Sequence, residues 1–258
     1  MRGVDIPPRF MTKGRTMADS VPVAPTVVLV HGAFADAASW AGVTELLLGA
    51  GLSVQAPANP LRGIAGDSAY IASLLRQIDG PVLAVGHSYG GAIISNAATQ
   101  APNVVGLVFV AAFAPELDEK LSDVEGTSRD SALGSALLQA DFPAADGSTA
   151  VELYVDPTKF HQVFAADLPE AQSGVLGASQ RPVAAAAFDE PNGAPAWKTL
   201  PSWAVVATGD KAAGADVILS MAQRAKAEIL ELEGSHLIMV SQPAAVAEVI
   251  LKAVKAVS

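Results

Sequence analysis

The stretch that decides the fold is Gly86-His87-Ser88-Tyr89-Gly90, which follows the apolar run Pro81-Val82-Leu83-Ala84-Val85 and precedes a helix-like segment from Gly91 to Gln100. A Gly-x-Ser-x-Gly pattern at a strand-to-helix turn indicates a nucleophile elbow, in which a strained backbone lifts the serine hydroxyl off a sheet. Side chains at the two outer glycines are expected to collide with the neighbouring strand or helix. Because Gly-rich chains also contain such pentapeptides by chance, the interpretation depends on the surrounding segments.

Short apolar runs alternate with helix-like segments on both sides of this turn. Strands are expected at 26–30, 52–56, 81–85, 104–110, 202–207 and 228–232. Helices are expected at 36–49, 67–78, 91–100, 216–227 and 243–257. Apolar runs without alternation are typical of strands buried on both faces of a parallel sheet. The sequence therefore predicts an α/β fold with a doubly wound, mostly parallel sheet of about six strands.

One long connection interrupts this alternation. Residues 26–115 and 199–258 are expected to form the core, whereas residues 116–198 contain no clear strand and only short helix-like pieces. Such a long insertion is usually functional, and it would leave the carboxyl end of the fourth strand, where open α/β sheets bind ligands. We therefore predict a helical cap over the site, with a second packing layer as the alternative. Its aromatic residues would wall an apolar pocket or fill core: Tyr154, Phe160, Phe164 and Trp197.

Composition restricts the partners of the chain. With 16 Lys plus Arg against 26 Asp plus Glu, the formal charge of −10 disfavours nucleic acid and anionic membranes as partners. No apolar stretch is long enough for a membrane span, and the absence of cysteine excludes disulfides and thiolate chemistry. Residues 1–25 are expected to be a flexible arm rather than a secretory signal, which predicts a cytoplasmic protein. The sequence leaves open whether the protein is a homodimer.

A serine nucleophile requires a base and a carboxylate that orients the base. Among the four histidines, only His236 follows a predicted strand late in the chain, in a loop at the same sheet edge as Ser88. Asp210 ends the preceding strand and is the preferred acid, which gives the chain order Ser, acid, His. Glu116 and Asp118, just after the fourth strand, are the alternative acids. Asp216 is better suited to capping the next helix.

The reaction also requires hydrogen-bond donors for a developing oxyanion. The backbone N–H of Tyr89 is one candidate, and the turn after the first strand supplies a second, for which Ala33 is the best choice. Phe34 in the same turn either lines the pocket or fills core. His161, in the insertion, either contacts substrate or serves as a capping or solvated residue.

Four segments give the chain a recognisable family likeness: HGAFADAASW (31–40), GHSYGG (86–91), ATGD (207–210) and GSH (234–236). From Thr26 onward the chain resembles the α/β-hydrolase superfamily, and within it the branch of plant methyl-salicylate-type esterases and hydroxynitrile lyases. The resemblance implies Ser88, Asp210 and His236 as a catalytic triad, Ala33 and Tyr89 as oxyanion donors, and a helical cap. It implies no metal or organic cofactor.

Two positions bear on the chemistry that the resemblance implies. Lyases of this branch resemble one another in having threonine at the position of Gly32 and lysine at that of Leu237, where the lysine binds departing cyanide. The sequence therefore favours a serine carboxylester hydrolase that acts on a small to medium apolar ester. The alternatives are a cofactor-free perhydrolase, hydroxynitrile-lyase-like activity, and a non-catalytic ligand-binding protein on a hydrolase scaffold.

Overall fold

A parallel sheet forms the central layer of the protein. The computed structural model describes residues 24–258, so the predicted N-terminal arm lies almost wholly outside the described residues. The six strands have the order β2-β1-β3-β4-β8-β9. They are β1 (Thr26–Val30), β2 (Val54–Gln55), β3 (Val82–His87), β4 (Val104–Val110), β8 (Ser202–Ala207) and β9 (Glu228–Leu232). Each pairs with its neighbours in parallel, which confirms the predicted sheet.

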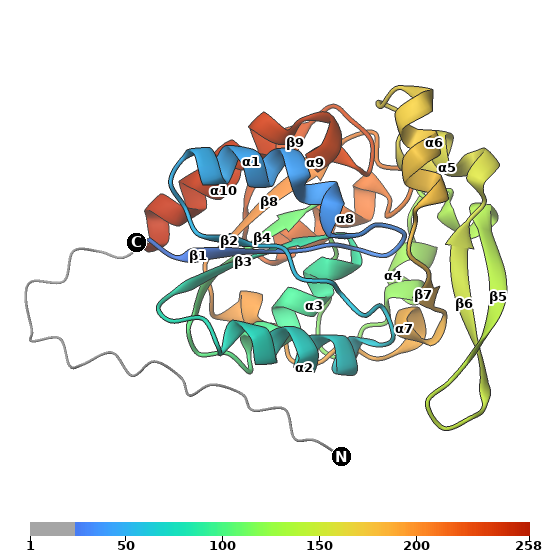
Figure 1. The fold of residues 1–258 in the computed structure, drawn as a ribbon, viewed down its shortest axis with the longest axis horizontal. Coiled ribbons are helices and arrows are strands. Elements are labelled where there is room, and N and C mark those ends of the chain that lie inside the picture. Colours follow the sequence, from blue (N-terminus) through green and yellow to red (C-terminus); the bar gives the residue numbers. More distant parts are fainter. Residues whose placement is uncertain (1–23) are drawn as a thin grey trace, which may run out of the picture.

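Helices cover both faces of this sheet (Figure 1). Helices α1 (Ala41–Gly49) and α10 (Pro243–Val257) pack together on one face, and α2 (Ile64–Leu75) and α3 (Tyr89–Ala98) pack together on the other. Helix α8 (Ala215–Arg224) packs against β8 and β9. A short 3₁₀ helix, η1 (Ala37–Trp40), precedes α1, and α9 (Ile238–Ser241) is a short helix that the sequence did not predict. The doubly wound α/β architecture is confirmed.

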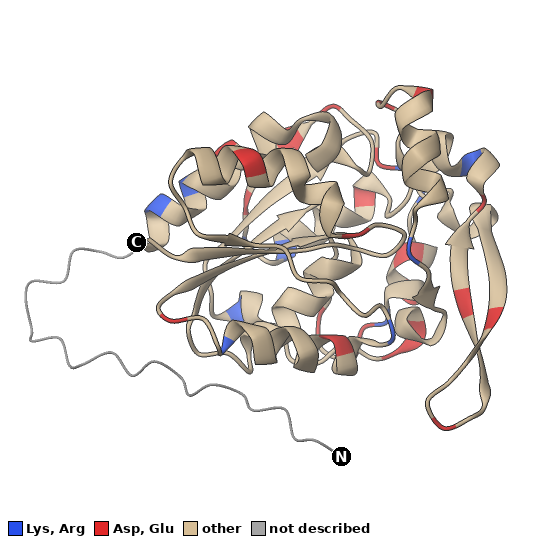
Figure 2. Ribbon diagram, viewed as in Figure 1, with Lys and Arg blue, Asp and Glu red and all other residues tan. Residues whose placement is uncertain are grey.

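The inner strands supply the core. Strands β3 and β8 are buried at every residue, and β1, β3, β4 and β8 contain no charged side chain. Figure 2 accordingly shows the charged residues mainly on helices and loops. The edge strand β9 differs, because Glu228 and Glu231 are exposed. Within residues 24–258, no helix combines the length and the apolar composition needed to cross a membrane.

The insertion between β4 and β8 lies beyond the carboxyl ends of the central strands (Figure 1). Its helical elements are α4 (Leu121–Gly126), η2 (Leu133–Ala136), α5 (Pro157–Phe164), α6 (Glu170–Ala178), α7 (Ala186–Asp189) and η3 (Ala196–Lys198). It also contains a three-stranded antiparallel sheet of β5 (Leu137–Pro143), β6 (Thr149–Val155) and β7 (Val183–Ala184).

The prediction that this segment lacks strands is therefore wrong, and the cap is mixed rather than purely helical. Strand β5 is exposed along most of its length and includes Gln139, Ala140 and Asp141, residue types that are neutral or unfavourable in strands. Its pairing with β6, rather than its own composition, makes it a strand. Gly147, with a φ of 84°, turns the chain between the two strands.

Candidate active site

Ser88 occupies the turn between β3 and α3 in a strained conformation. Its φ of 53° and ψ of −126° lie outside the regions that side chains favour, at a cost of about 1–3 kcal/mol. Its backbone carbonyl accepts hydrogen bonds from the N–H of Gly91 at 2.9 Å and of Phe113 at 3.2 Å. These bonds hold the turn against the loop that follows β4. The serine itself is 6% exposed and is therefore almost wholly buried.

The glycines around Ser88 are required by close contact with other backbone segments. A Cβ at Gly86 would lie 2.5 Å from the carbonyl oxygen of Gly90, and a Cβ at Gly90 would lie 2.5 Å from that of Val30. A Cβ at Gly91 would collide with the carbonyl oxygen of Phe113. The predicted collision of side chains with the neighbouring strand and helix is therefore confirmed.

Asp210 and His236 form a buried pair at the carboxyl ends of β8 and β9. The Nδ1 atom of His236 lies 2.7 Å from Oδ2 of Asp210, and each side chain is 1% exposed. The other oxygen, Oδ1 of Asp210, accepts the N–H groups of Ala212 at 2.9 Å and of Ala213 at 3.0 Å. An acceptor at Nδ1 fixes the proton on that nitrogen and leaves Nε2 of His236 free to accept a proton.

Ser88 directly follows His87, and the His87 side chain contacts His236 of this pair. The ring of His87 lies 4.6 Å from that of His236, centroid to centroid, and its Nε2 donates to the His236 carbonyl oxygen at 3.0 Å. The Ser88 hydroxyl itself has no hydrogen bond within the described part of the chain. Such bonds are often absent from an enzyme without substrate and form in the complex.

The remaining histidines have other environments. His31 is buried, and its Nε2 accepts the N–H of Asn59 at 2.9 Å while its Nδ1 donates to the Gly32 carbonyl oxygen. Burial lowers the pKa of His31 and holds the pKa of His87 well below its usual value. Both rings are therefore neutral elements of the core that position the two turns beside Ser88.

The turn after β1 lies directly against Ser88. A Cβ at Gly32 would be 2.6 Å from the Cβ of Ser88, so the two backbones are in close contact. The next residue, Ala33, carries one predicted oxyanion donor. The N–H of Phe34, by contrast, already donates to the Arg181 carbonyl oxygen at 3.1 Å. Tyr89 begins α3, and N–H groups in the first turn of a helix have no partner within the helix.

Tyr89 has a second interaction that the sequence did not predict. Its hydroxyl donates to Oδ2 of Asp67 at 2.9 Å, and the Asp67 carboxyl group also accepts the N–H of Arg62. Burial raises the pKa of Asp67 and, more strongly, the pKa of Tyr89. Asp67 lies on the apolar face of α2, which indicates a buried polar partner. The sequence does not identify this partner as Tyr89, because Tyr89 belongs to another helix.

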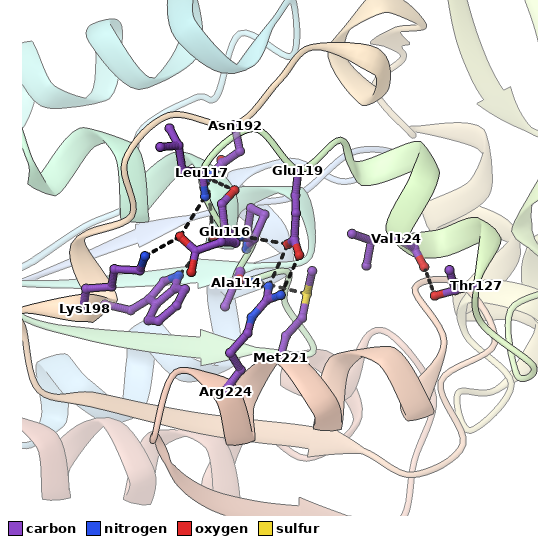
Figure 3. A network of polar contacts seen from close by, with 12 residues as sticks. Ala114, Glu116, Leu117, Glu119, Val124, Thr127, Asn192, Lys198, Met221 and Arg224 are labelled. Atoms are coloured by element: carbon purple, nitrogen blue, oxygen red, sulfur yellow. Dashed lines mark hydrogen bonds and ion pairs between the residues drawn. The ribbon is translucent and has the colours of Figure 1, made fainter.

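The alternative acids lie in a separate network (Figure 3). Glu116 pairs with Lys198 at 2.6 Å, and Glu119 pairs with Arg224 at 2.5 Å. The Lys198 interaction holds the pKa of Glu116 below its usual value. The backbone N–H of Asp118 donates to the Asn192 carbonyl oxygen. These groups stabilise the loop after β4 and have no bond to His236.

Asp216 does not have the predicted capping position. The N-cap of α8 is Gly214, and Asp216 lies in the first turn of the helix. Its carboxylate instead accepts the hydroxyl of Ser128 at 2.5 Å and the N–H of Arg129 at 2.9 Å. The reason is that residues 128–132 of the cap fold back onto this loop, a contact with no local sequence signature.

Aromatic residues of the cap cover His236. The ring of Phe164, in α5, lies 4.7 Å from that of His236 and 5.9 Å from that of Phe34. Phe160 lies 5.0 Å from Phe164, and a narrow cavity beside this cluster is lined in part by Phe34, Phe160 and Leu237. Phe34, Phe160 and Phe164 therefore form an apolar roof next to the candidate base.

The other predicted cap residues lie elsewhere. Nδ1 of His161 is 2.9 Å from the hydroxyl of Ser173 and joins α5 to α6. The Tyr154 hydroxyl donates to Glu152 at 2.8 Å. Nε1 of Trp197 donates to the Pro115 carbonyl oxygen at 3.1 Å.

Known proteins share this fold and its arrangement of elements. The chain is similar to polyneuridine aldehyde esterase, with 19% identity over 90% of this chain and 99% of the other and a TM-score of 0.76. It is similar to the pyrethroid hydrolase PytH, with 23% identity, 91% and 99% coverage and a TM-score of 0.72. An extracellular alpha/beta-hydrolase from a Paenibacillus species gives 22% identity, 89% and 98% coverage and a TM-score of 0.71.

Sequence comparison gives the family directly. No curated protein matches the chain in sequence. The profile of the alpha/beta hydrolase family, however, matches residues 27–249, which include the elbow, Asp210 and His236. With the elbow at the end of β3 and the mixed cap after β4, the chain belongs to the alpha/beta hydrolase family.

Proposed function

We propose that the protein is a serine carboxylester hydrolase that acts on a small to medium apolar ester through an acyl-enzyme on Ser88. The observation that carries this proposal is the buried His236–Asp210 pair, 2.7 Å apart, beside the strained turn of Ser88. Proteins of the same fold include an esterase and a pyrethroid hydrolase, which agrees with ester chemistry.

In the proposed first half-reaction, Nε2 of His236 accepts the Ser88 proton while Oγ attacks the ester carbonyl carbon. Asp210 holds the imidazole in the required tautomer and stabilises its positive charge. The N–H groups of Ala33 and Tyr89 stabilise the oxyanion, aided by the positive end of α3. His236 then protonates the departing alcohol.

The second half-reaction uses the same groups with water as the nucleophile. Nε2 of His236 removes a proton from water, which attacks the acyl carbon and releases the acid from Ser88. The apolar roof of Phe34, Phe160 and Phe164 favours an apolar acyl or alcohol group. His161, bound to Ser173, would influence such a substrate only through the packing of α5 on α6.

Two features argue against cyanohydrin cleavage. Leu237, 2% exposed beside His236, supplies no cation for a departing anion. A threonine at position 32 would place its Cβ 2.6 Å from that of Ser88, so the turn after β1 would have to shift.

The decisive experiment compares the wild type with Ser88→Ala on p-nitrophenyl esters of graded chain length. Ser95→Ala is the matched control, because Ser95 lies in the helix after the elbow and its buried hydroxyl has no partner among residues 24–258. We expect Ser88→Ala to lose turnover by several orders of magnitude, and fluorophosphonate to label Ser88 in the wild type. Tight binding of an ester without turnover or labelling would instead favour a ligand-binding protein.

A further inference from the structure

The loop that carries Asp210 is fastened to the cap by a series of hydrogen bonds. One side is the cap segment 128–132, and the other is the acid loop, residues 210–216. The bonds are Ala132 N–H to Lys211 O (2.8 Å), Ser131 Oγ to Ala212 O (2.8 Å), Arg129 N–H to Asp216 Oδ2 (2.9 Å), Asp216 N–H to Asp130 Oδ2 (3.1 Å) and Ser128 Oγ to Asp216 Oδ1 (2.5 Å). The position of the catalytic carboxylate therefore depends on the cap as well as on β8.

Within this series, the Ser131 hydroxyl group lies next to two oxygen atoms but has only one proton to donate. Its Oγ lies 2.8 Å from the Ala212 carbonyl oxygen and 2.9 Å from Oε1 of Glu125, and it accepts the N–H of Leu133 at 3.2 Å. A hydroxyl group has one donor and two acceptor positions. Each of the three contacts is a separate two-centre hydrogen bond only if Glu125 is protonated and donates to Ser131, while Ser131 donates to Ala212.

The surroundings of Glu125 favour this protonated form. Burial against the cap raises the pKa of Glu125, and the negative charge of Asp210 raises it further. Hydrogen bonds that Ser131 and Gly134 can donate to the ionised carboxylate, and the charge of His236 when protonated, act in the opposite direction. His236 and Asp210 are the titratable groups that face Glu125, so its charge is coupled to the candidate catalytic pair.

We propose that protonated Glu125 is a positioning residue for the catalytic acid. Its carboxylic O–H donates to Ser131, Ser131 donates to the Ala212 carbonyl oxygen, and the Ala212 N–H holds Oδ1 of Asp210. Glu125 has no local sequence signature, because α4 places it beside Ser131 only in the folded cap. This inference rests on the proposed ester hydrolysis.

Ionisation of Glu125 has one consequence for that reaction. Ser131 must then donate to the carboxylate, so the Ala212 carbonyl oxygen loses its partner and the acid loop loses one bond to the cap. This loss reduces kcat/KM as the pH rises through the pKa of Glu125.

The test compares kcat/KM of the wild type and Glu125→Gln across the pH range on one p-nitrophenyl ester. A glutamine NH₂ group can donate to Ser131 at every pH. We expect the variant-to-wild-type ratio to stay near one at low pH and to rise to roughly fivefold at high pH, the effect of one neutral hydrogen bond. Glu170→Gln, at an exposed cap glutamate, is the matched control and should give a flat ratio.

A second pair of variants isolates the route through Ser131. On a Ser131→Ala background, Glu125→Gln should lose most of its pH-dependent effect, because the intermediate hydroxyl is absent. A ratio that is flat with pH in the Ser131 background and in the wild-type background alike would overturn the proposal.

Infrared spectroscopy of the wild type tests the same idea without substrate. The wild-type minus Glu125→Gln difference should contain a protonated carboxyl band at a pH where exposed glutamates are ionised. If this band is absent, the assignment of a protonated Glu125 is wrong, whatever the activity. If the band is present but no ester is hydrolysed, the proposed function fails and the hydrogen-bond assignment stands.

Discussion

Replacement of Asp210 by asparagine tests the candidate site most directly, because the carboxylate has a different partner on each oxygen. Oδ1 accepts the N–H groups of Ala212 and Ala213, and Oδ2 accepts Nδ1–H of His236. In Asp210→Asn, the amide oxygen must remain toward the two N–H groups, since an NH₂ group there would oppose two donors. The NH₂ group then faces His236.

The consequence is a change of tautomer at the base. Nδ1 of His236 must accept from the new amide, so the ring proton moves to Nε2, the atom that has to accept the Ser88 proton. We expect kcat to fall by about 10⁴-fold, as it does in serine proteases whose imidazole proton is on the wrong nitrogen. This factor corresponds to about 5 kcal/mol of transition-state stabilisation. Folding should be little affected, because the two backbone bonds to the side-chain oxygen are kept.

The assay measures kcat for p-nitrophenyl ester hydrolysis, with thermal unfolding as the check on folding. Asp118→Asn is the comparison, because Asp118 is the competing acid and lies with the Glu116 network rather than beside His236. The reasoning is refuted if Asp210→Asn stays within tenfold of the wild type while correctly folded. A loss in Asp118→Asn as large as that in Asp210→Asn would likewise refute it.

Three further changes test the packing around the site. Gly32→Ala places a Cβ 2.6 Å from that of Ser88. We expect about 1–3 kcal/mol of destabilisation in urea unfolding and a lower kcat in ester turnover. Wild-type values for both measurements would contradict the close contact. Phe164→Ala removes a side chain that packs on His236 and Phe34. The free energy of unfolding should fall by about 3–5 kcal/mol and KM for apolar esters should rise. A fall below about 1 kcal/mol would show that the roof is loosely packed. Burial raises the pKa of Asp67 above the ordinary 3.8, so between 3.8 and the raised value the folded state binds more protons than the unfolded state. The free energy of unfolding of the wild type should therefore fall as the pH rises through this window. Urea midpoints of Asp67→Asn should lack this slope.

The strands of the core could be predicted because burial on both faces leaves a direct trace in the sequence. Segments such as 104–110 and 202–207 are apolar apart from Ser202, and the structure has strands with those bounds. The order of Ser88, Asp210 and His236 follows from the same pattern, since parallel strands bring their carboxyl ends to one edge. The glycine requirement at the elbow is equally local, because Gly86 faces the first turn of α3 and Gly90 faces the end of β1, a parallel neighbour of β3.

The cap could not be predicted in the same way. Strand β5 has one partner and little buried surface, so its residues carry no periodic pattern. The partners of Asp67 and Glu125 are set by folding between distant segments, since Asp67 binds Tyr89 from another element and Glu125 binds a hydroxyl that in turn contacts the acid loop. A polar residue in an apolar setting indicates only that some partner exists.

These contacts connect the cap to each part of the candidate site. Phe164 packs on the ring of His236, the segment 128–132 binds the acid loop, and Arg62, whose N–H binds Asp67, pairs with Glu152 of β6 at 2.9 Å. Any opening of the cap that exposes Ser88 to a large ester must therefore preserve the bonds to the acid loop or lose alignment of Asp210. Movement confined to α6 meets this condition, whereas α5 is joined to the loop of His236 by the bond from Leu237 N–H to the Phe164 carbonyl oxygen at 3.3 Å. Substrate entry is thus expected near Leu176 of α6, which lines the narrow cavity with Phe160, while the region of Glu125 and Ser131 stays fixed.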